Sequence, residues 1–166
     1  MLPAYIPNPV AALLGGGTPV DLGRDFSDRR RVFGDGKTYR GFAAGVLAGV
    51  GVGLLQMWSF HAYNLAYLPE HTFTTIIVLS SGALIGDLVK SFFKRRMKKD
   101  RGEKWPVADM YDLVAGSLIL LLVIDPGWVF VNITLPVLLL ILILTPILHR
   151  SVNIIGYLFR IKEVPW

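Results

Sequence analysis

The chain has 166 residues, 53% of them hydrophobic, and a mean hydropathy of +0.53, which is typical of a polytopic membrane protein and excludes an ordinary soluble domain. It contains no cysteine, so disulfides, thiolate metal sites and cysteine nucleophiles are excluded as well. The net charge is +5, and because the basic residues cluster in short loops, they favour lipid head groups or nucleotides over nucleic acid as partners.

The apolar pattern predicts one all-α domain over residues 1–166, a polytopic transmembrane helical bundle with basic cytoplasmic loops. We expect about five membrane segments, at residues 1–17, 41–62, 72–93, 107–124 and 128–148. The first is shorter than the roughly 20 residues of a full span and contains three prolines. It is therefore either a short or re-entrant membrane segment or a surface segment. In the last segment, Pro136 and Pro146 are expected to kink the helix.

Glycines recur every four residues in the segment 41–62, at Gly41, Gly45, Gly49 and Gly53. This spacing places them along one face of a helix, where small residues let another helix approach closely. The pattern favours a packing stripe over a functional site.

The distribution of charge predicts the orientation in the membrane. Every Lys and Arg lies in residues 24–40, in residues 90–104 or after His149, whereas the connections 63–71 and 125–127 contain none. By the positive-inside rule, loops 18–40 and 94–106 and the tail 149–166 are cytoplasmic. We expect a multi-pass protein of the cell membrane. Trp58, Tyr63 and Tyr67 are typical of an aromatic belt at the opposite interface, and Trp166 of an interfacial tail.

Three carboxylates lie near the cytoplasmic ends of two apolar segments. Asp87 shares one helix face with Lys90, Ser91 and Lys94, and Asp109 and Asp112 are three residues apart at the start of the next segment. An acid at the centre of a bilayer costs about 2.5–3.5 kcal/mol or more, so these need compensating cations. If the two helices are antiparallel neighbours, the carboxylates converge. Spacing alone leaves two readings open: a divalent metal site, or pairing with lysines and a helix dipole.

Two further features could bind phosphates. One is a basic run that follows the segment 72–93. It is either a loop that determines the membrane orientation or a clamp for phosphate groups. The run consists of Lys94, Arg95, Arg96, Lys98, Lys99, Arg101 and Lys104. The other is a pair of Gly-rich stretches, whose amides could cradle phosphate oxygens. They lack the spacing of a Walker A motif. Their candidate residues are Gly16, Gly17, Thr18, Pro19, Gly36, Lys37 and Thr38.

These motifs together resemble the membrane cytidylyltransferases that make CDP-activated lipids. The bacterial CDP-diacylglycerol synthases carry G-D-L, then S-x-x-K-R, a K-D pair, a P-G-H-G-G loop and D-R-x-D. The matching residues here are Gly86 to Leu88, Ser91 to Arg95, Lys99 with Asp100, and Asp109 with Asp112. The His-Gly-Gly stretch and the Arg of the acidic pair are missing. The Gly-rich stretches and W-P-V-x-D-x-x-D resemble the archaeal CDP-archaeol synthases more closely, and this resemblance covers most of residues 8–117.

The resemblance implies a function and a set of site residues. CTP and an unsaturated isoprenoid ether-lipid phosphate, 2,3-di-O-geranylgeranylglycerol 1-phosphate, would give CDP-archaeol and pyrophosphate in a Mg²⁺-dependent reaction on the cytoplasmic side. It implies Asp87, Asp109 and Asp112 as metal ligands and catalytic residues, with Lys94 and Arg95. CTP would contact the two Gly-rich stretches together with Lys90, Ser91 and Lys94.

Two other classes of protein remain as alternatives. A small cation transporter or channel subunit could use membrane-embedded carboxylates, but these acids lie at one interface and the basic loops would repel cations. A purely structural subunit would leave the Gly-rich stretches unexplained. The sequence leaves the oligomeric state open, with a homodimer as one option.

Overall fold

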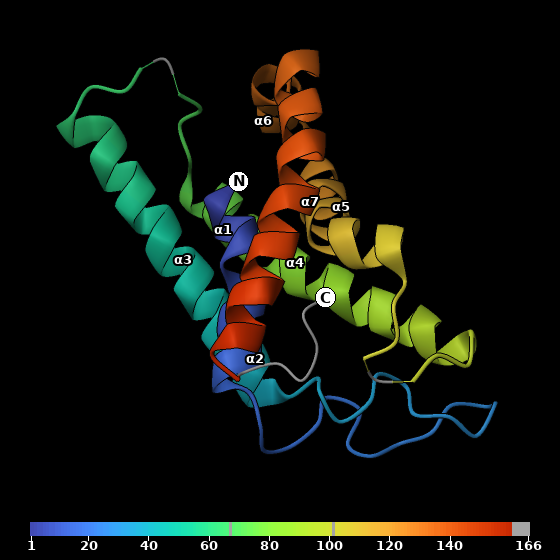
Figure 1. Cartoon of the computed structure of the whole chain (residues 1–166). Helices are drawn as coiled ribbons and strands as arrows, with labels where there is room; N and C mark the ends of the chain where they lie inside the picture. The colour runs from blue at the N-terminus through green and yellow to red at the C-terminus, as the bar shows by residue number, and fades with distance from the viewer. Residues whose placement is uncertain (67, 101, 161–166) are drawn as a thin grey trace.

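The computed structural model describes residues 1–66, 68–100 and 102–160 and is helical (Figure 1). This part of the chain forms no β-strand, only the isolated bridges Pro19–Thr38 and Asp25–Arg31. The all-α prediction is confirmed. The expectations for Tyr67, Arg101 and Trp166 fall on residues outside the described ranges. The helices are α1 (Leu2–Tyr5), α2 (Pro7–Leu14), α3 (Tyr39–Ala62), α4 (Phe73–Arg96), α5 (Pro106–Ile124), α6 (Pro126–Asn132) and α7 (Leu135–Leu158).

Four helices of the described residues, α3, α4, α5 and α7, are long and apolar enough to cross a membrane, which confirms a polytopic helical bundle. The apolar segment Leu2–Leu14 is shorter. Its helices α1 and α2 contact both α3 and α4, and Pro3, Ala4 and Pro7 are buried. The structure thus packs this short segment against α3 and α4, and its place in the membrane stays a prediction.

The expected continuous span at residues 128–148 is two helices. α6 ends at Asn132, and α7 starts after Thr134, whose backbone is extended. The prediction that Pro136 kinks a continuous helix is therefore wrong. Pro136 lies in the first turn of α7, where the N–H that proline lacks would have no helical partner. α7 then continues to Leu158, so much of the expected tail 149–166 is helical.

The glycine stripe of α3 packs as its spacing predicts. Gly41, Gly45, Gly49 and Gly53 are buried. A Cβ on Gly45 would lie 2.6 Å from the Pro7 carbonyl oxygen, and one on Gly53 would lie 2.5 Å from Cγ2 of Ile76. The stripe thus accommodates the N-terminal segment on one side and α4 on the other.

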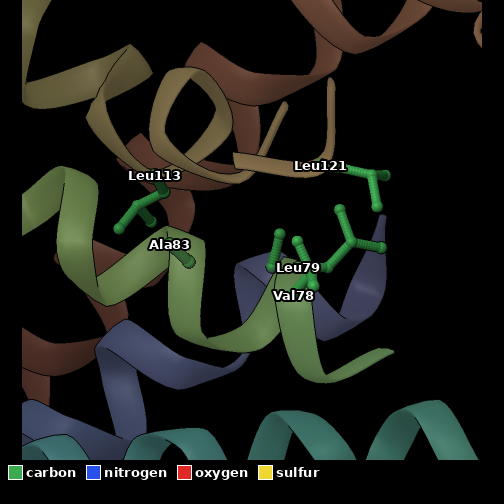
Figure 2. Packing of buried hydrophobic residues seen from close by; sticks show 6 residues of the cluster. Val78, Leu79, Ala83, Leu113 and Leu121 are labelled. Atoms are coloured by element: carbon green, nitrogen blue, oxygen red, sulfur yellow. The ribbon is translucent and has the colours of Figure 1, made fainter. Parts of the chain in front are cut away.

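Among the described helices, α4 and α5 pack against each other most extensively, and this packing positions the charged residues. Val78, Leu79 and Ala83 of α4 lie against Leu113 and Leu121 of α5 (Figure 2). Nearer the basic loops, Gly86 of α4 and Gly116 of α5 bring the two backbones together: a Cβ on Gly116 would lie 2.6 Å from the Gly86 Cα. Small residues at this crossing let helices approach without a gap.

The loop between α2 and α3 folds over the same end of the bundle as the α4–α5 turn (Figure 1). It is built around the buried carboxylate of Asp21. Burial alone would raise the pKa of Asp21, but hydrogen bonds from Arg31 and from the amides of Gly34, Phe33 and Gly23 outweigh it and hold that pKa well below its ordinary value. The loop is thereby fixed by an internal charged centre.

Arg96, at the end of α4, attaches this loop to the bundle. Its Nε lies 2.7 Å from Oδ2 of Asp28, and its Nη2 donates to the Arg30 and Arg31 carbonyl oxygens. The guanidinium also stacks over the ring of Phe26, 4.8 Å from its centroid. The loop therefore lies across the end of α4 rather than extending into solvent.

Gly116→Ala should destabilise the protein, because the new Cβ would lie 2.4 Å from the Gly82 carbonyl oxygen, where only backbone could move. Overpacking of this kind costs about 1–3 kcal/mol. The matched control is Gly51→Ala on α3, where a Cβ meets nothing within 4 Å and Ala is the better helix former. Melting curves in detergent should show a clear drop for Gly116→Ala alone; equal curves would contradict the tight crossing.

Asp21→Asn should loosen the loop without unfolding the helices, since it removes the charge that Arg31 and three amides contact. Hydrogen bonds to a charged group are worth about 1.5–3 kcal/mol, so exchange at the Phe33 and Gly34 amides should accelerate at least about tenfold. Hydrogen–deuterium exchange of residues 30–37 measures this. Asp25→Asn, at an exposed position in the same loop, should leave the exchange unchanged, and similar rates in both variants would refute the anchoring role of Asp21.

Candidate functional site

The carboxylates of α4 and α5 converge around one lysine. Nζ of Lys90 lies 3.1 Å from Oδ1 of Asp87, 3.4 Å from Oδ1 of Asp109 and 2.6 Å from Oδ2 of Asp112. Asp87 and Asp112 are buried, with 4% and 8% of their surfaces exposed. The close α4–α5 crossing explains the convergence, because a Cβ on Gly86 would lie only 2.1 Å from the Asp112 backbone oxygen.

Two further lysines complete a balanced cluster. Lys37 comes from the loop and forms an ion pair with Asp87. Lys94, one turn beyond Lys90, donates to both oxygens of Asp109 at 3.1 and 3.2 Å. Three carboxylates thus meet three ammonium groups from α4 and the loop, and the formal charges cancel. We call these six residues the acid–lysine cluster: Asp87, Asp109, Asp112, Lys37, Lys90 and Lys94.

The secondary contacts of the acids differ. Oδ2 of Asp109 accepts from the Trp105 amide, 2.8 Å away, which satisfies a free N–H at the start of α5. Oδ1 of Asp112 accepts from the Leu113 amide, but its buried Oδ2 has no aligned hydrogen-bond donor, although Lys90 is close to it. Oδ2 of Asp112 is thus held by its ion pair with Lys90, and it is a carboxylate oxygen of the kind that a hard divalent cation binds.

A metal ion would still need a rearrangement at this place. Among the described residues, no three His, Cys, Asp or Glu side chains form a ready-made metal-binding group. The three carboxylates point toward a common region, but the ammonium of Lys90 occupies it. The donor chemistry fits Mg²⁺, which prefers carboxylate oxygens, provided that Lys90 moves aside.

The other candidates on α4 surround this cluster. Ser91 is buried next to Lys90. Arg95 contacts both connecting segments. Its Nη1 donates to the Lys99 carbonyl oxygen of the α4–α5 turn at 2.7 Å, and Gly34 of the α2–α3 loop packs against its guanidinium. The buried Nε of Arg95 has no hydrogen-bond acceptor in the described structure. That leaves a cationic donor available close to the loop.

The two Gly-rich stretches lie side by side but differ in burial. The Val20 amide donates to the Lys37 carbonyl oxygen at 2.7 Å, and the Tyr39 amide donates to the Thr18 carbonyl oxygen at 3.1 Å. Thr38 is buried and caps α3 by accepting from the Gly41 amide, a structural role that sequence reasoning did not assign to it. Gly16 and Gly17 are exposed and have positive φ angles, with open space around them.

A pocket of about 70 Å³ adjoins the cluster between α2, α3, α4 and the loop. Gly36, Lys37, Thr38 and Asp87 line it, whereas the stretch from Gly16 to Pro19 does not. Ligand pockets commonly measure about 300–1,000 Å³, so a nucleotide would have to displace the loop or bind across its outer side.

Sequence reasoning missed three residues of this region. Asp21 organises the loop, and the sequence feature that could have identified it is its position between the two Gly-rich stretches. Arg96 was part of the basic run but was not singled out as the residue that holds the loop. Asn8 lines the pocket near Lys37, and a lone amide in an apolar segment could have marked it.

Comparisons with known proteins agree along the whole chain. The family model described as CDP-archaeol synthase (CarS-like) matches residues 1–166. The CDP-archaeol synthases of Methanoculleus marisnigri and Methanosphaerula palustris are 61% and 58% identical to the chain, each with full coverage of both proteins. That of Methanosarcina mazei is 43% identical, again over the full length of both proteins.

A solved structure has the same fold. It is described as an intramembrane enzyme for archaeal membrane lipids biosynthesis, and it is 31% identical to this chain with a TM-score of 0.68. The match covers 98% of this chain and 90% of the other. With the family model and the relatives, this places the chain in the CDP-archaeol synthase family.

Proposed function

We infer that the chain carries out the reaction for which its family is named. It is a cytidylyltransferase that joins CTP to an unsaturated archaeal ether-lipid phosphate, giving CDP-archaeol and pyrophosphate. The observation that carries this is the end-to-end match to CDP-archaeol synthases in a chain whose buried acid–lysine cluster lies where membrane helices meet polar loops.

The chemistry needs little from the protein in the way of acid or base. A phosphate monoester has a second pKa near 6, so the lipid phosphate is already a nucleophile near neutral pH. Its oxygen attacks the α-phosphorus of CTP, and the bond from that phosphorus to the β-phosphate oxygen breaks, releasing pyrophosphate. The protein must align the two phosphates and offset their negative charges.

We assign this role to the cationic side chains around the cluster. Lys37 and Lys94 each carry an ammonium group that now contacts a carboxylate and can exchange it for a phosphate oxygen. Arg95 adds a guanidinium whose Nε lacks an acceptor. Ser91 and Lys90 complete the face of α4, and the amides of both Gly-rich stretches offer further donors to the triphosphate.

The metal site is proposed at Asp87, Asp109 and Asp112. Mg²⁺ held by these carboxylates would supply positive charge that offsets the negative charge of the nucleotide phosphates. The convergence of the three carboxylates on one place supports this assignment. Asp109 also accepts from the Trp105 amide at the start of α5, so its substitution should weaken that helix cap as well.

The site is proposed to face the cytoplasm. The loop 15–38 and the α4–α5 turn hold most of the basic residues, and Arg96 ties the two together at one end of the bundle. CTP is water-soluble, whereas the isoprenoid tails of the acceptor stay in lipid. A cluster at the ends of membrane helices lets the two substrates meet.

Single substitutions Asp→Asn at positions 87, 109 and 112 test whether these acids bind metal or only form ion pairs with lysines. If the acids hold metal, each variant should insert in the membrane yet lose at least about tenfold in activity and need more Mg²⁺, because a charged contact is worth about 1.5–3 kcal/mol. The measurement is a Mg²⁺ titration of CDP-lipid formation, with a melting curve for each variant.

Asp125→Asn is the matched control, since Asp125 caps α6 at the other end of α5 and Asn caps equally well. It should keep both activity and Mg²⁺ response. Variants at all three positions that lose stability but show an unchanged Mg²⁺ response would mean that the acids only pair with lysines.

The orientation can be tested with single cysteines, because the chain has none of its own. Lys98→Cys and Asp25→Cys should react with a membrane-impermeant maleimide only from the cytoplasmic side, and Pro69→Cys only from outside, as the positive-inside rule requires. All three positions are exposed. Labelling of Lys98→Cys in intact cells would reverse the proposed topology.

A further inference from the structure

The centre of the acid–lysine cluster is occupied by a cation that belongs to the protein. Nζ of Lys90 lies between 2.6 and 3.4 Å from an oxygen of each of the three acids, and the Lys90 side chain is only 15% exposed. Lys37 and Lys94 contact one acid each, at the edge of the cluster. Lys90 alone touches all three acids among the ion pairs of the described residues.

We propose that Lys90 is an internal counter-cation that prevents the three acids from binding a free divalent cation and makes metal binding conditional on CTP. This inference rests on the proposed function, in which Asp87, Asp109 and Asp112 hold Mg²⁺. It adds a residue that decides when they do so.

The first argument is spatial. Mg²⁺ binds oxygens at about 2.0–2.1 Å, so an ion shared by these carboxylates would lie in the region where Nζ of Lys90 now lies. Two cations at one point repel each other strongly in a partly buried site. The metal can therefore enter only as the ammonium leaves.

The second argument is charge balance. The cluster is neutral, with three acids against Lys37, Lys90 and Lys94. Free Mg²⁺ would leave two uncompensated positive charges in a poorly solvated place. A triphosphate carries roughly four negative charges near neutral pH, because its terminal phosphate has a pKa near 6. Mg²⁺ that arrives with CTP therefore brings net negative charge, and the displaced ammonium gains a phosphate partner.

The third argument is mobility. The ammonium of lysine sits on a flexible four-carbon stem, so Lys90 can turn from the carboxylates to a phosphate without movement of α4. The pocket next to Asp87 and Lys37 lies on the side toward the loop, where the triphosphate is proposed to bind. A lysine that served only as a fixed structural partner would instead keep its contacts when CTP and metal are bound.

The test uses full-length protein in detergent, without lipid acceptor, and Mn²⁺ as a spectroscopic substitute for Mg²⁺. Without CTP, wild type should bind Mn²⁺ weakly by electron paramagnetic resonance titration, whereas Lys90→Met should bind it at least about tenfold more tightly. Lys90→Arg, which keeps the charge, should resemble wild type. Lys98→Met removes the same charge from an exposed position and should also resemble wild type.

A second measurement does not depend on one variant folding well. The melting temperature of wild type should rise with Mg²⁺ only when CTP is present, whereas that of Lys90→Met should start lower and rise with Mg²⁺ alone. Tight Mn²⁺ binding by wild type without CTP would overturn the proposal, as would Lys90→Met with unchanged Mn²⁺ affinity.

The outcomes also separate this inference from the proposed metal site. If Mg²⁺ with CTP stabilises wild type but not the Asp87→Asn and Asp112→Asn variants, while Lys90→Met gains no affinity, the metal site stands and the role of Lys90 is refuted. If Mg²⁺ stabilises none of these proteins beyond CTP alone, the metal site itself is refuted, and the role of Lys90 with it.

Discussion

Charge compensation in a poorly solvated region is the constraint on which this structure depends. Two acids of the site are almost fully buried within apolar helices, where an unpaired carboxylate would be costly. Each is compensated by lysines from its own or a neighbouring element, and Lys37 must come from a loop fifty residues earlier. The need for that lysine explains why so much of the loop, with Asp21 at its centre and Arg96 as its anchor, is ordered against the end of α4.

Close helix packing makes this compensation possible. Ion pairs among five side chains of two helices require backbones that nearly touch, and Gly82, Gly86 and Gly116 provide that contact. Ser117 supports it by donating to the Leu79 carbonyl oxygen at 2.8 Å. Apolar surface cannot drive helices together within lipid, so small residues and such hydrogen bonds must hold α4 and α5 in register. The register then determines which acids reach Lys90.

The membrane helices and the acids of the site could be predicted from the sequence. Length and hydropathy identify membrane helices, and acidic residues within or next to such apolar segments are rare. The three-residue spacings correctly indicated that Asp87, Asp109 and Asp112 would lie together. The central position of Lys90 could not be predicted, since it depends on the exact crossing of α4 and α5. The break between α6 and α7 could not be predicted either, because Pro136 is compatible with both a kinked helix and a helix start.

The short N-terminal segment explains how a polar site can lie within the bundle, away from the ends of the membrane helices. Asp87 lies nine residues before the end of α4, about 13 Å along the axis at 1.5 Å per residue. α2 ends at Leu14, and beside it Ala11 and Ala12 share a pocket with Lys37 and Asp87. A helix of full length would place apolar turns where the loop now enters. Because the segment stops early, the loop can enter beside α2, and Lys37 meets the membrane-helix acid Asp87 in that pocket.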